Sequence, residues 1–137
     1  MKITIESVVH APIASVWRAY TKPEHITQWN QASDDWHCPR AENDLRVGGR
    51  YVARMEAKDG SFGFDLEGIY SEVTLQKSLA YVMGDGRHVR VTFEDQNGAT
   101  KVRTLFDAEA QNSPKMQRDG WQAILDNFAR YAAHAQA

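Results

Sequence analysis

The chain has 137 residues, of which 42% are hydrophobic and 25% charged, and its formal net charge is −2. A chain of this length can bury a core of its own, so we expect a single domain over residues 1–137. The charge excludes the strongly basic surface of proteins that bind nucleic acid or anionic membranes. No apolar run approaches the ~20 residues of a membrane-spanning helix.

The single cysteine and the N-terminal pattern indicate a cellular compartment. Cys38 has no partner for an internal disulfide, which is typical of a reducing environment. The first residues alternate in polarity, whereas a secretory signal needs an apolar core of roughly 7–15 residues. We therefore expect a cytoplasmic protein with no membrane insertion.

The first third of the chain predicts a strand, two short helices and a loop. Residues 2–9 alternate between apolar and polar side chains, as a strand does. Residues 12–20 carry apolar side chains at helical spacing, and Pro12 suits the first turn. A second short helix follows over residues 23–29. The polar stretch over residues 30–45 is expected to be irregular.

Five further strands are predicted before the C-terminal region. Asp59-Gly60 and Asn97-Gly98 are hairpin-turn signals, and Gly48-Gly49 marks a bulge or tight bend where one strand begins. Alternation within each strand predicts an antiparallel meander with one apolar face. The strands are expected over residues 50–56, 62–70, 79–83, 88–94 and 101–106.

The last element is a long amphipathic helix that runs to about His134. Ser113 supplies its N-cap, and Pro114 suits its first turn. The apolar face of the meander needs a cover, and only this helix is long enough to provide it. The sequence therefore predicts an α+β helix-grip fold. In it, a curved antiparallel sheet of about six strands wraps around the C-terminal helix, with two short helices after the first strand.

Several short motifs, in order along nearly the whole chain, carry a family resemblance. They are Ala11-Pro12, Val16-Trp17-Arg18-Ala19-Tyr20-Thr21-Lys22-Pro23-Glu24, Leu45-Arg46-Val47-Gly48-Gly49-Arg50-Tyr51, Glu67-Gly68-Ile69-Tyr70-Ser71-Glu72-Val73, Val91-Thr92-Phe93-Glu94, and Gly120-Trp121 with Leu125, Phe128 and Tyr131. The chain resembles the START-like superfamily (SRPBCC, the polyketide-cyclase or birch-pollen-allergen fold). Within it, the chain is similar to the bacterial homologues of the activator of heat-shock protein 90 ATPase. One departure is Trp29-Asn30, where the family usually has two adjacent tryptophans.

The resemblance implies an apolar ligand cavity between the sheet and the last helix, and strand register then predicts its lining. The alternative is that the same side chains form a packed core. Gly120 either leaves space for a ligand or a close backbone contact, or marks a kink or a late helix start. The expected lining residues are Tyr51, Ala53, Met55, Phe62, Phe64, Leu66, Tyr70, Tyr81, Val91, Phe93, Thr104 and Phe106 from the sheet, Met116, Gln117, Trp121, Leu125 and Phe128 from the helix, and Trp36 turned inward at the mouth.

Neither a metal site nor a catalytic centre is predicted. Asp34, Asp35, His37 and Cys38 are all ligand types, but adjacent His37-Cys38 cannot readily share one tetrahedral ion and no second pair follows. We expect no metal and no cofactor. Cys38 also lacks a nucleophile motif that would pair it with a histidine. The histidines considered are His25, His37 and His88.

Asp65 and Glu67 lie two residues apart on the polar face of one predicted strand, where we expect them to be solvated. An inverted register would turn Glu67 into the cavity as an acid or base with a raised pKa. It would also bury several arginines, which is costly, so the first register is preferred.

Three functions follow from this reading. The preferred one is binding of a hydrophobic small molecule (lipid-, polyketide- or flavonoid-like). The alternatives are an enzyme of cyclase or hydrolase type on the same cavity and a chaperone-linked protein-interaction module. Glu67, His25 or His88 facing the cavity would favour the enzyme, and an exposed apolar patch of roughly several hundred Å² outside its mouth would favour the module. Nucleic acid is not an expected partner, and a homodimer is left open.

Overall fold

The computed structural model describes residues 1–135, which form seven strands and three helices. In chain order these are β1 (Lys2–Val9), α1 (Ile13–Thr21), α2 (Pro23–Trp29), β2 (Trp36–Asn43), β3 (Arg50–Ala57), β4 (Gly63–Thr74), β5 (Ser78–Met83), β6 (His88–Gln96), β7 (Ala99–Asp107) and α3 (Pro114–His134).

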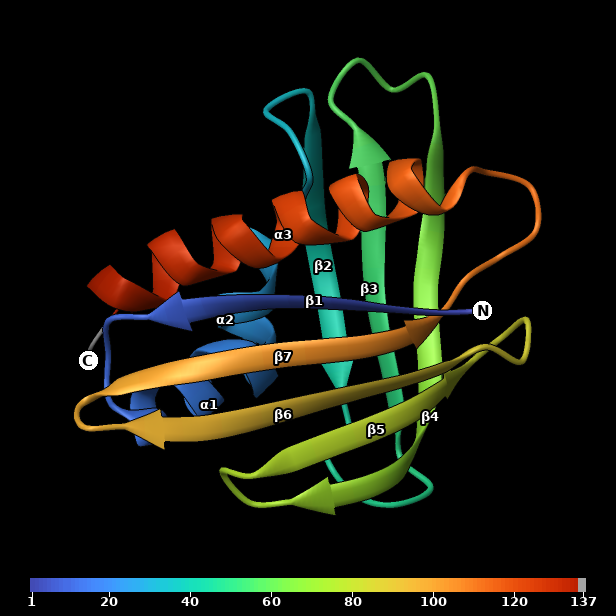
Figure 1. Cartoon of the computed structure of the whole chain (residues 1–137). Helices are drawn as coiled ribbons and strands as arrows, with labels where there is room; N and C mark the ends of the chain where they lie inside the picture. The colour runs from blue at the N-terminus through green and yellow to red at the C-terminus, as the bar shows by residue number, and fades with distance from the viewer. Residues whose placement is uncertain (136–137) are drawn as a thin grey trace.

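One antiparallel sheet holds all seven strands in the order β1-β7-β6-β5-β4-β3-β2. The sheet curls: β5, β6, β7 and β1 run across the view in Figure 1, whereas β2, β3 and β4 stand nearly upright. The long strand β4 carries a register shift between Tyr70 and Glu72, next to β5. A bulge of this kind bends a strand and increases its twist. The curled sheet therefore presents a concave face.

The structure corrects one predicted element and the strand number. Residues 36–43, expected to be irregular, form the edge strand β2, so the sheet has seven strands and not about six. The pairing with β3 shifts register between His37 and Arg40, and Pro39 lies at that irregularity. Proline lacks an N–H for the ladder but is tolerated at a bulge of an edge strand. Cys38 is the one fully buried residue of this strand, so its alternation between buried and exposed positions is weak.

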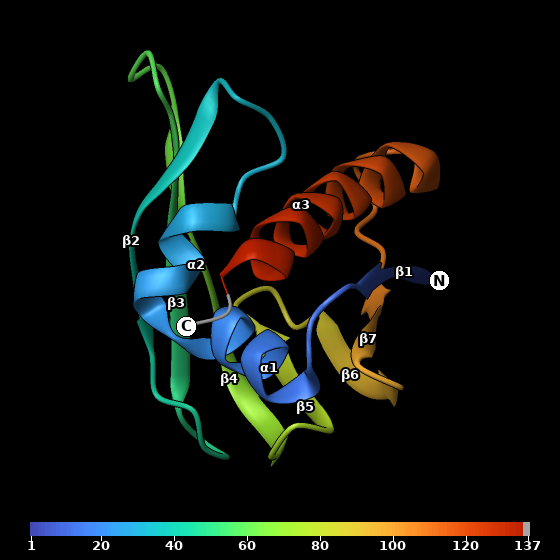
Figure 2. The same ribbon diagram turned by 90° about the vertical axis from the view of Figure 1, so that its left-hand side faces the viewer.

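The three helices lie on the concave side of the sheet, and α3 crosses it (Figure 2). Ser113 caps α3 by accepting a hydrogen bond from the Met116 N–H at 3.1 Å, as the sequence predicts. The helix is continuous through Gly120, so it does not start late at this residue. No helix among the described residues combines the length and the apolarity that crossing a bilayer requires.

Aromatic rings close one end of the concave face. Phe128 of α3 makes edge contacts with Tyr20 of α1 and Trp29 of α2, at centroid distances of 5.1 and 4.9 Å. Phe93 of β6 packs in the same way against Trp17 and Tyr20. The wedge of α1 and α2 thus fills this end of the space between the sheet and α3.

Candidate ligand-binding cavity

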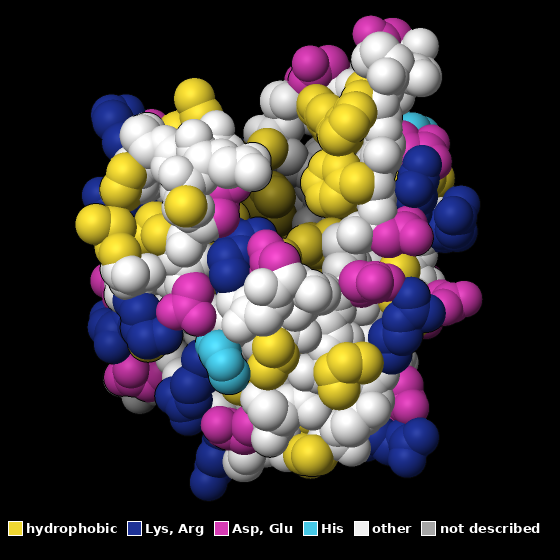
Figure 3. Space-filling model, turned by 90° about the vertical axis from the view of Figure 1, so that its right-hand side faces the viewer, with side chains coloured by type: hydrophobic (Ala, Val, Ile, Leu, Met, Phe, Trp, Pro, Cys, Tyr) yellow, Lys and Arg dark blue, Asp and Glu magenta, His cyan; other side chains and the backbone are white. Residues whose placement is uncertain are grey.

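The space between the sheet and α3 is not completely filled, and a cavity of about 250 Å³ remains. Figure 3 shows a hollow in one face of the molecule, with hydrophobic side chains in its walls and floor. The lining residues are Ile5, Tyr20, Trp29, Asn30, Tyr51, Met55, Phe64, Leu66, Tyr81, Met83, Arg87, Thr104, Trp121, Ile124 and Leu125. Most of these side chains are aliphatic or aromatic, as in sites for apolar ligands.

Two aromatic walls are held by their neighbours. The indole of Trp121 stacks on Phe106 with centroids 3.8 Å apart and planes within 6°. The ring of Tyr81 lies over Gly68, where an added Cβ would come within 2.6 Å of the ring. Glycine at residue 68 therefore allows the Tyr81 ring to lie this close to β4. Contacts with other parts of the protein therefore fix the position of both rings.

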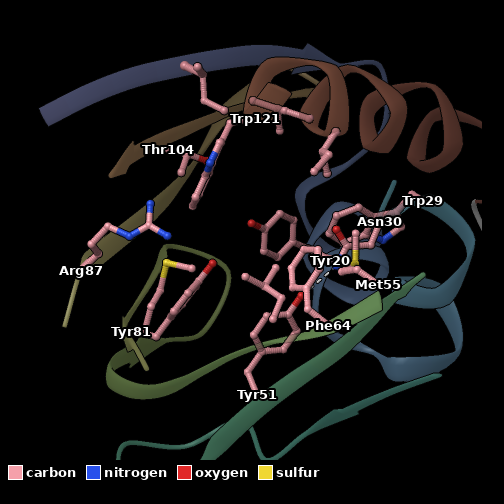
Figure 4. Close-up of a pocket in the computed structure, with 15 residues that line it drawn as sticks. Tyr20, Trp29, Asn30, Tyr51, Met55, Phe64, Tyr81, Arg87, Thr104 and Trp121 are labelled. Carbon is pink, nitrogen blue, oxygen red and sulfur yellow. Dashed lines mark hydrogen bonds between the residues drawn. The ribbon is translucent and has the colours of Figure 1, made fainter. Parts of the chain in front are cut away.

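Tyrosine hydroxyls supply part of the polarity in the cavity. Burial raises the pKa of Tyr20, Tyr51 and Tyr81, so these phenols stay protonated and act as hydrogen-bond donors. Asn30 donates through Nδ2 to the Tyr51 hydroxyl at 3.0 Å (Figure 4). This bond orients the Tyr51 hydroxyl while leaving its own hydrogen available. The buried hydroxyl of Thr104 adds another polar group.

Arg87 is the one charged residue among those that line the cavity. It comes from the turn between β5 and β6, and its side chain is 22% exposed. Its Nε donates to Asp85 Oδ2 at 2.8 Å, and its main-chain N–H donates to Asp85 Oδ1 at 3.1 Å. Asp85 itself does not line the cavity. The turn thus holds one guanidinium at the edge of an otherwise uncharged space.

The structure brings a core of the predicted lining together. Leu66 lines the cavity from β4, and Trp121 lines it from α3. The predicted residues that do line the cavity are Tyr51, Met55, Phe64, Leu66, Tyr81, Thr104, Trp121 and Leu125. Contact between these residues and a ligand stays a prediction.

Other predicted lining residues are covered by protein. Phe93 and Phe128 belong to the aromatic end of the core, because the wedge of α1 and α2 packs on them. Phe106 lies behind Trp121. Ala53 and Val91 are fully buried and outside the lining. The strand faces were predicted correctly, but these positions on them are occupied by packed side chains.

A second group of predicted lining residues points away from the cavity. The Tyr70 hydroxyl donates to Asn43 Oδ1 at 2.7 Å, toward β2. Gln117 uses its amide to bind main-chain groups of the loop before α3, including the Glu109 N–H at 2.8 Å. Met116 is 62% exposed. The predicted contributions of these three side chains to the lining are therefore wrong.

Trp36 and Phe62 lie outside the lining, where they form an aromatic group with the lining residue Phe64. The three ring centroids lie 6.0–6.1 Å apart. Phe62 is 60% exposed and Phe64 is 42% exposed, and only Phe64 reaches the cavity. Trp36 is half-buried against these two rings and is not turned into the cavity. The group adjoins the cavity through Phe64.

Sequence reasoning did not place seven lining residues, which are Ile5, Tyr20, Trp29, Asn30, Met83, Arg87 and Ile124. Ile5 and Met83 share strand faces with predicted apolar residues, and Ile124 is one turn from Trp121, so their patterns carried a usable signal. Arg87 lies in a turn, where side-chain direction follows no period. The wedge residues required knowledge of where α1 and α2 dock.

The groups considered for catalysis lie elsewhere. Glu67 pairs with Arg50 on the outer face of the sheet, which supports the preferred register. His25 Nδ1 is 2.5 Å from the Tyr131 hydroxyl, between α2 and α3, and neither His25 nor His88 lines the cavity. Within residues 1–135 no three His, Cys, Asp or Glu side chains gather in a metal-binding group.

Cys38 is expected to react slowly in the native protein. The thiol is buried and its Sγ lies 3.5 Å from the Arg40 carbonyl oxygen. Burial raises its pKa to about 11. At pH 8 roughly one thiol in a thousand would be ionised at that pKa, and the thiolate is the reactive form. We expect labelling by Ellman's reagent to be at least about 100-fold slower in native than in denatured protein. Equal rates would contradict the burial of this residue.

A curled antiparallel sheet that holds a long helix over an apolar cavity defines a helix-grip protein of the START-like class. Residues 10–133 match the family described as activator of Hsp90 ATPase homolog 1-like protein. The chain belongs to that family, in agreement with the resemblance seen in its motifs. The START-like fold commonly binds hydrophobic ligands. No curated protein matches the chain.

Solved structures of bacterial proteins share the fold. An AHSA1-like protein from Aeromonas hydrophila is 48% identical, with a TM-score of 0.90 over 96% of this chain and 91% of that one. Chr148 from Cytophaga hutchinsonii is 45% identical, with a TM-score of 0.83 over 95% and 90% of the two chains. CV1439 from Chromobacterium violaceum is 21% identical, with a TM-score of 0.85 over 96% of each chain, and shows the fold alone.

Proposed function

We propose that this protein binds a hydrophobic small molecule in the cavity between the sheet and α3. The observation that carries the proposal is a preformed space of about 250 Å³ that opens to solvent and is walled by aromatic and aliphatic side chains. This volume is slightly below the ~300–1,000 Å³ usual for drug-sized ligands. A ligand with a short chain or one to three rings suits it better than a sterol-sized one.

The structure gives less support to the other two functions. A cyclase or hydrolase would need an acid or base facing the cavity, and no carboxylate or histidine is among the lining residues. A protein-interaction module would need an apolar patch apart from the mouth. The exposed group of Trp36, Phe62 and Phe64 instead adjoins the cavity through Phe64. It serves ligand entry in our proposal.

Filling the cavity tests the proposal directly. Leu66 faces the cavity from β4, so Leu66→Trp places an indole in the space a ligand would occupy. We expect the affinity for the uncharged dye N-phenyl-1-naphthylamine, measured by fluorescence titration, to fall at least about tenfold, because binding an apolar ligand depends on this space. Native mass spectrometry of protein purified from its own host is expected to show a co-purifying apolar molecule.

Ile69→Trp is the matched control, because Ile69 lies on the same strand with its side chain 47% exposed on the outer face. It should leave dye binding unchanged. Saturable binding that is equally weakened by both variants would place the dye outside the cavity. A wild-type protein that neither binds the dye nor retains any molecule from its host would contradict the proposed function.

A further inference from the structure

The cavity has one ionic group, and the chemistry of that group narrows the ligand. Arg87 stands alone among uncharged lining residues, and Figure 4 shows its side chain reaching toward the space bounded by Trp121 and Tyr81. Figure 3 shows a basic and an acidic side chain at the rim of the hollow. A purely apolar ligand would make no hydrogen bond with the guanidinium at this position and would only displace water from it, which costs free energy.

The way Arg87 is held leaves part of it available. Asp85 engages Nε through one carboxylate oxygen at 2.8 Å, and its other oxygen accepts the Arg87 main-chain N–H. Among residues 1–135 the structure shows no hydrogen bond from the two terminal nitrogens, Nη1 and Nη2, of Arg87. These two nitrogens form the end-on fork of the guanidinium, which matches the two oxygens of a carboxylate.

The salt bridge with Asp85 does not remove the preference of Arg87 for a carboxylate on the ligand. Its side chain is 55% exposed and lies outside the lining, whereas that of Arg87 is 22% exposed. Water screens the charge of the exposed partner more strongly than that of the partly buried one. The salt bridge restrains the guanidinium, so less side-chain entropy is lost when a ligand binds to it.

We infer that the ligand is an amphipathic carboxylic acid, bound with its carboxylate on the free fork of Arg87 and its apolar body between the sheet and α3. This inference rests on the proposed function and adds the charge of the ligand to it. The hydroxyls of Tyr81 and Thr104 are further lining donors, and the remaining walls contact the apolar body. A fatty acid and an aromatic acid share this chemistry.

Two matched pairs of probes test the inference and distinguish a fatty acid from an aromatic acid as the ligand. One pair is decanoate and 1-nonanol, and the other is 1-naphthoate and 1-naphthol. At neutral pH the acids are ionised and the alcohols are not, while the apolar body is the same within each pair. Isothermal titration calorimetry gives the dissociation constants for the wild type, Arg87→Gln and Arg87→Lys.

In whichever pair binds, we expect the wild type to prefer the carboxylate at least about tenfold, as charge-assisted hydrogen bonds allow. Added salt should weaken carboxylate binding and leave alcohol binding unchanged. Arg87→Gln should abolish the preference while keeping the alcohol's dissociation constant within about threefold. Arg87→Lys should be intermediate, because an ammonium keeps the charge without the fork.

Arg90→Gln is the control for removing an arginine from β6. Arg90 lies on the outer face of the sheet, where it pairs with Glu72 and does not line the cavity. Its replacement should leave the dissociation constants of both the acid and the alcohol in each pair unchanged. Equal wild-type affinities within both pairs would overturn the inference even if no Arg87 variant folded. So would parallel losses of acid and alcohol in Arg87→Gln. If the dye binds but none of the four probes does, the inference fails while the proposed function stands.

Discussion

Phe128→Ala is expected to lower the free energy of unfolding by about 3–5 kcal/mol, as large-to-small replacements of buried aromatic residues do. Phe128 is fully buried, and its ring contacts those of Tyr20 and Trp29 edge-on at 5.1 and 4.9 Å. The variant loses both aromatic contacts and leaves a void where α1, α2 and α3 meet. Because a small domain has only ~5–15 kcal/mol of stability in total, this loss should be plain in chemical denaturation.

Met116→Ala on the same helix is the control. Met116 is 62% exposed, and alanine is at least as good a helix former, so its replacement should change stability by no more than about 0.5 kcal/mol. A loss of less than about 1.5 kcal/mol in Phe128→Ala would mean that the aromatic end of the core can close around the missing ring. Such a result would contradict tight packing of α3 against α1 and α2 at this end of the core.

Gly49→Ala is expected to cost at least about 2 kcal/mol, because the added methyl has no room. A Cβ at residue 49 would lie 2.0 Å from the Asp44 carbonyl oxygen and 2.9 Å from that of Arg46. Both atoms belong to the backbone of the turn between β2 and β3. Relieving the clash would move this turn, which also accepts the Tyr70 N–H through the Gly49 carbonyl at 3.0 Å.

Gly48→Ala separates this clash from an effect of backbone conformation. Gly48 has φ +83°, a value that favours glycine, but a Cβ there would meet no atom within 4 Å. Its replacement should cost about 1 kcal/mol, which is less than the cost at Gly49. Chemical denaturation of the two variants gives the comparison. The reverse order of stability would contradict the close packing of this turn.

Much of the fold could be predicted, because several of its signals are local. Alternation marked the strands of the meander, and Asn97-Gly98 forms its hairpin turn with both φ values positive. The Ser113 cap marked the start of α3 correctly. The edge strand β2 was missed because most of its residues are not buried and a bulge at Pro39 interrupts the alternation.

The candidate site was predicted only in part. Strand register indicates which face of the sheet a side chain lies on, and it placed Leu66 and Tyr81 correctly on the concave face. It does not indicate what covers that face. Phe93 shares the face, yet the wedge of α1 and α2 packs on it and removes it from the cavity.

The sequence by itself therefore determined the elements, their apolar faces and the need for a covering helix, since periodicity and turn chemistry depend on near neighbours in the chain. Only the tertiary structure decided where packing stops and the cavity begins. That boundary depends on how α1, α2 and α3 dock on the curled sheet, which no local pattern encodes. The same docking leaves Arg87, a residue of the β5–β6 turn, as the one charged group in the lining.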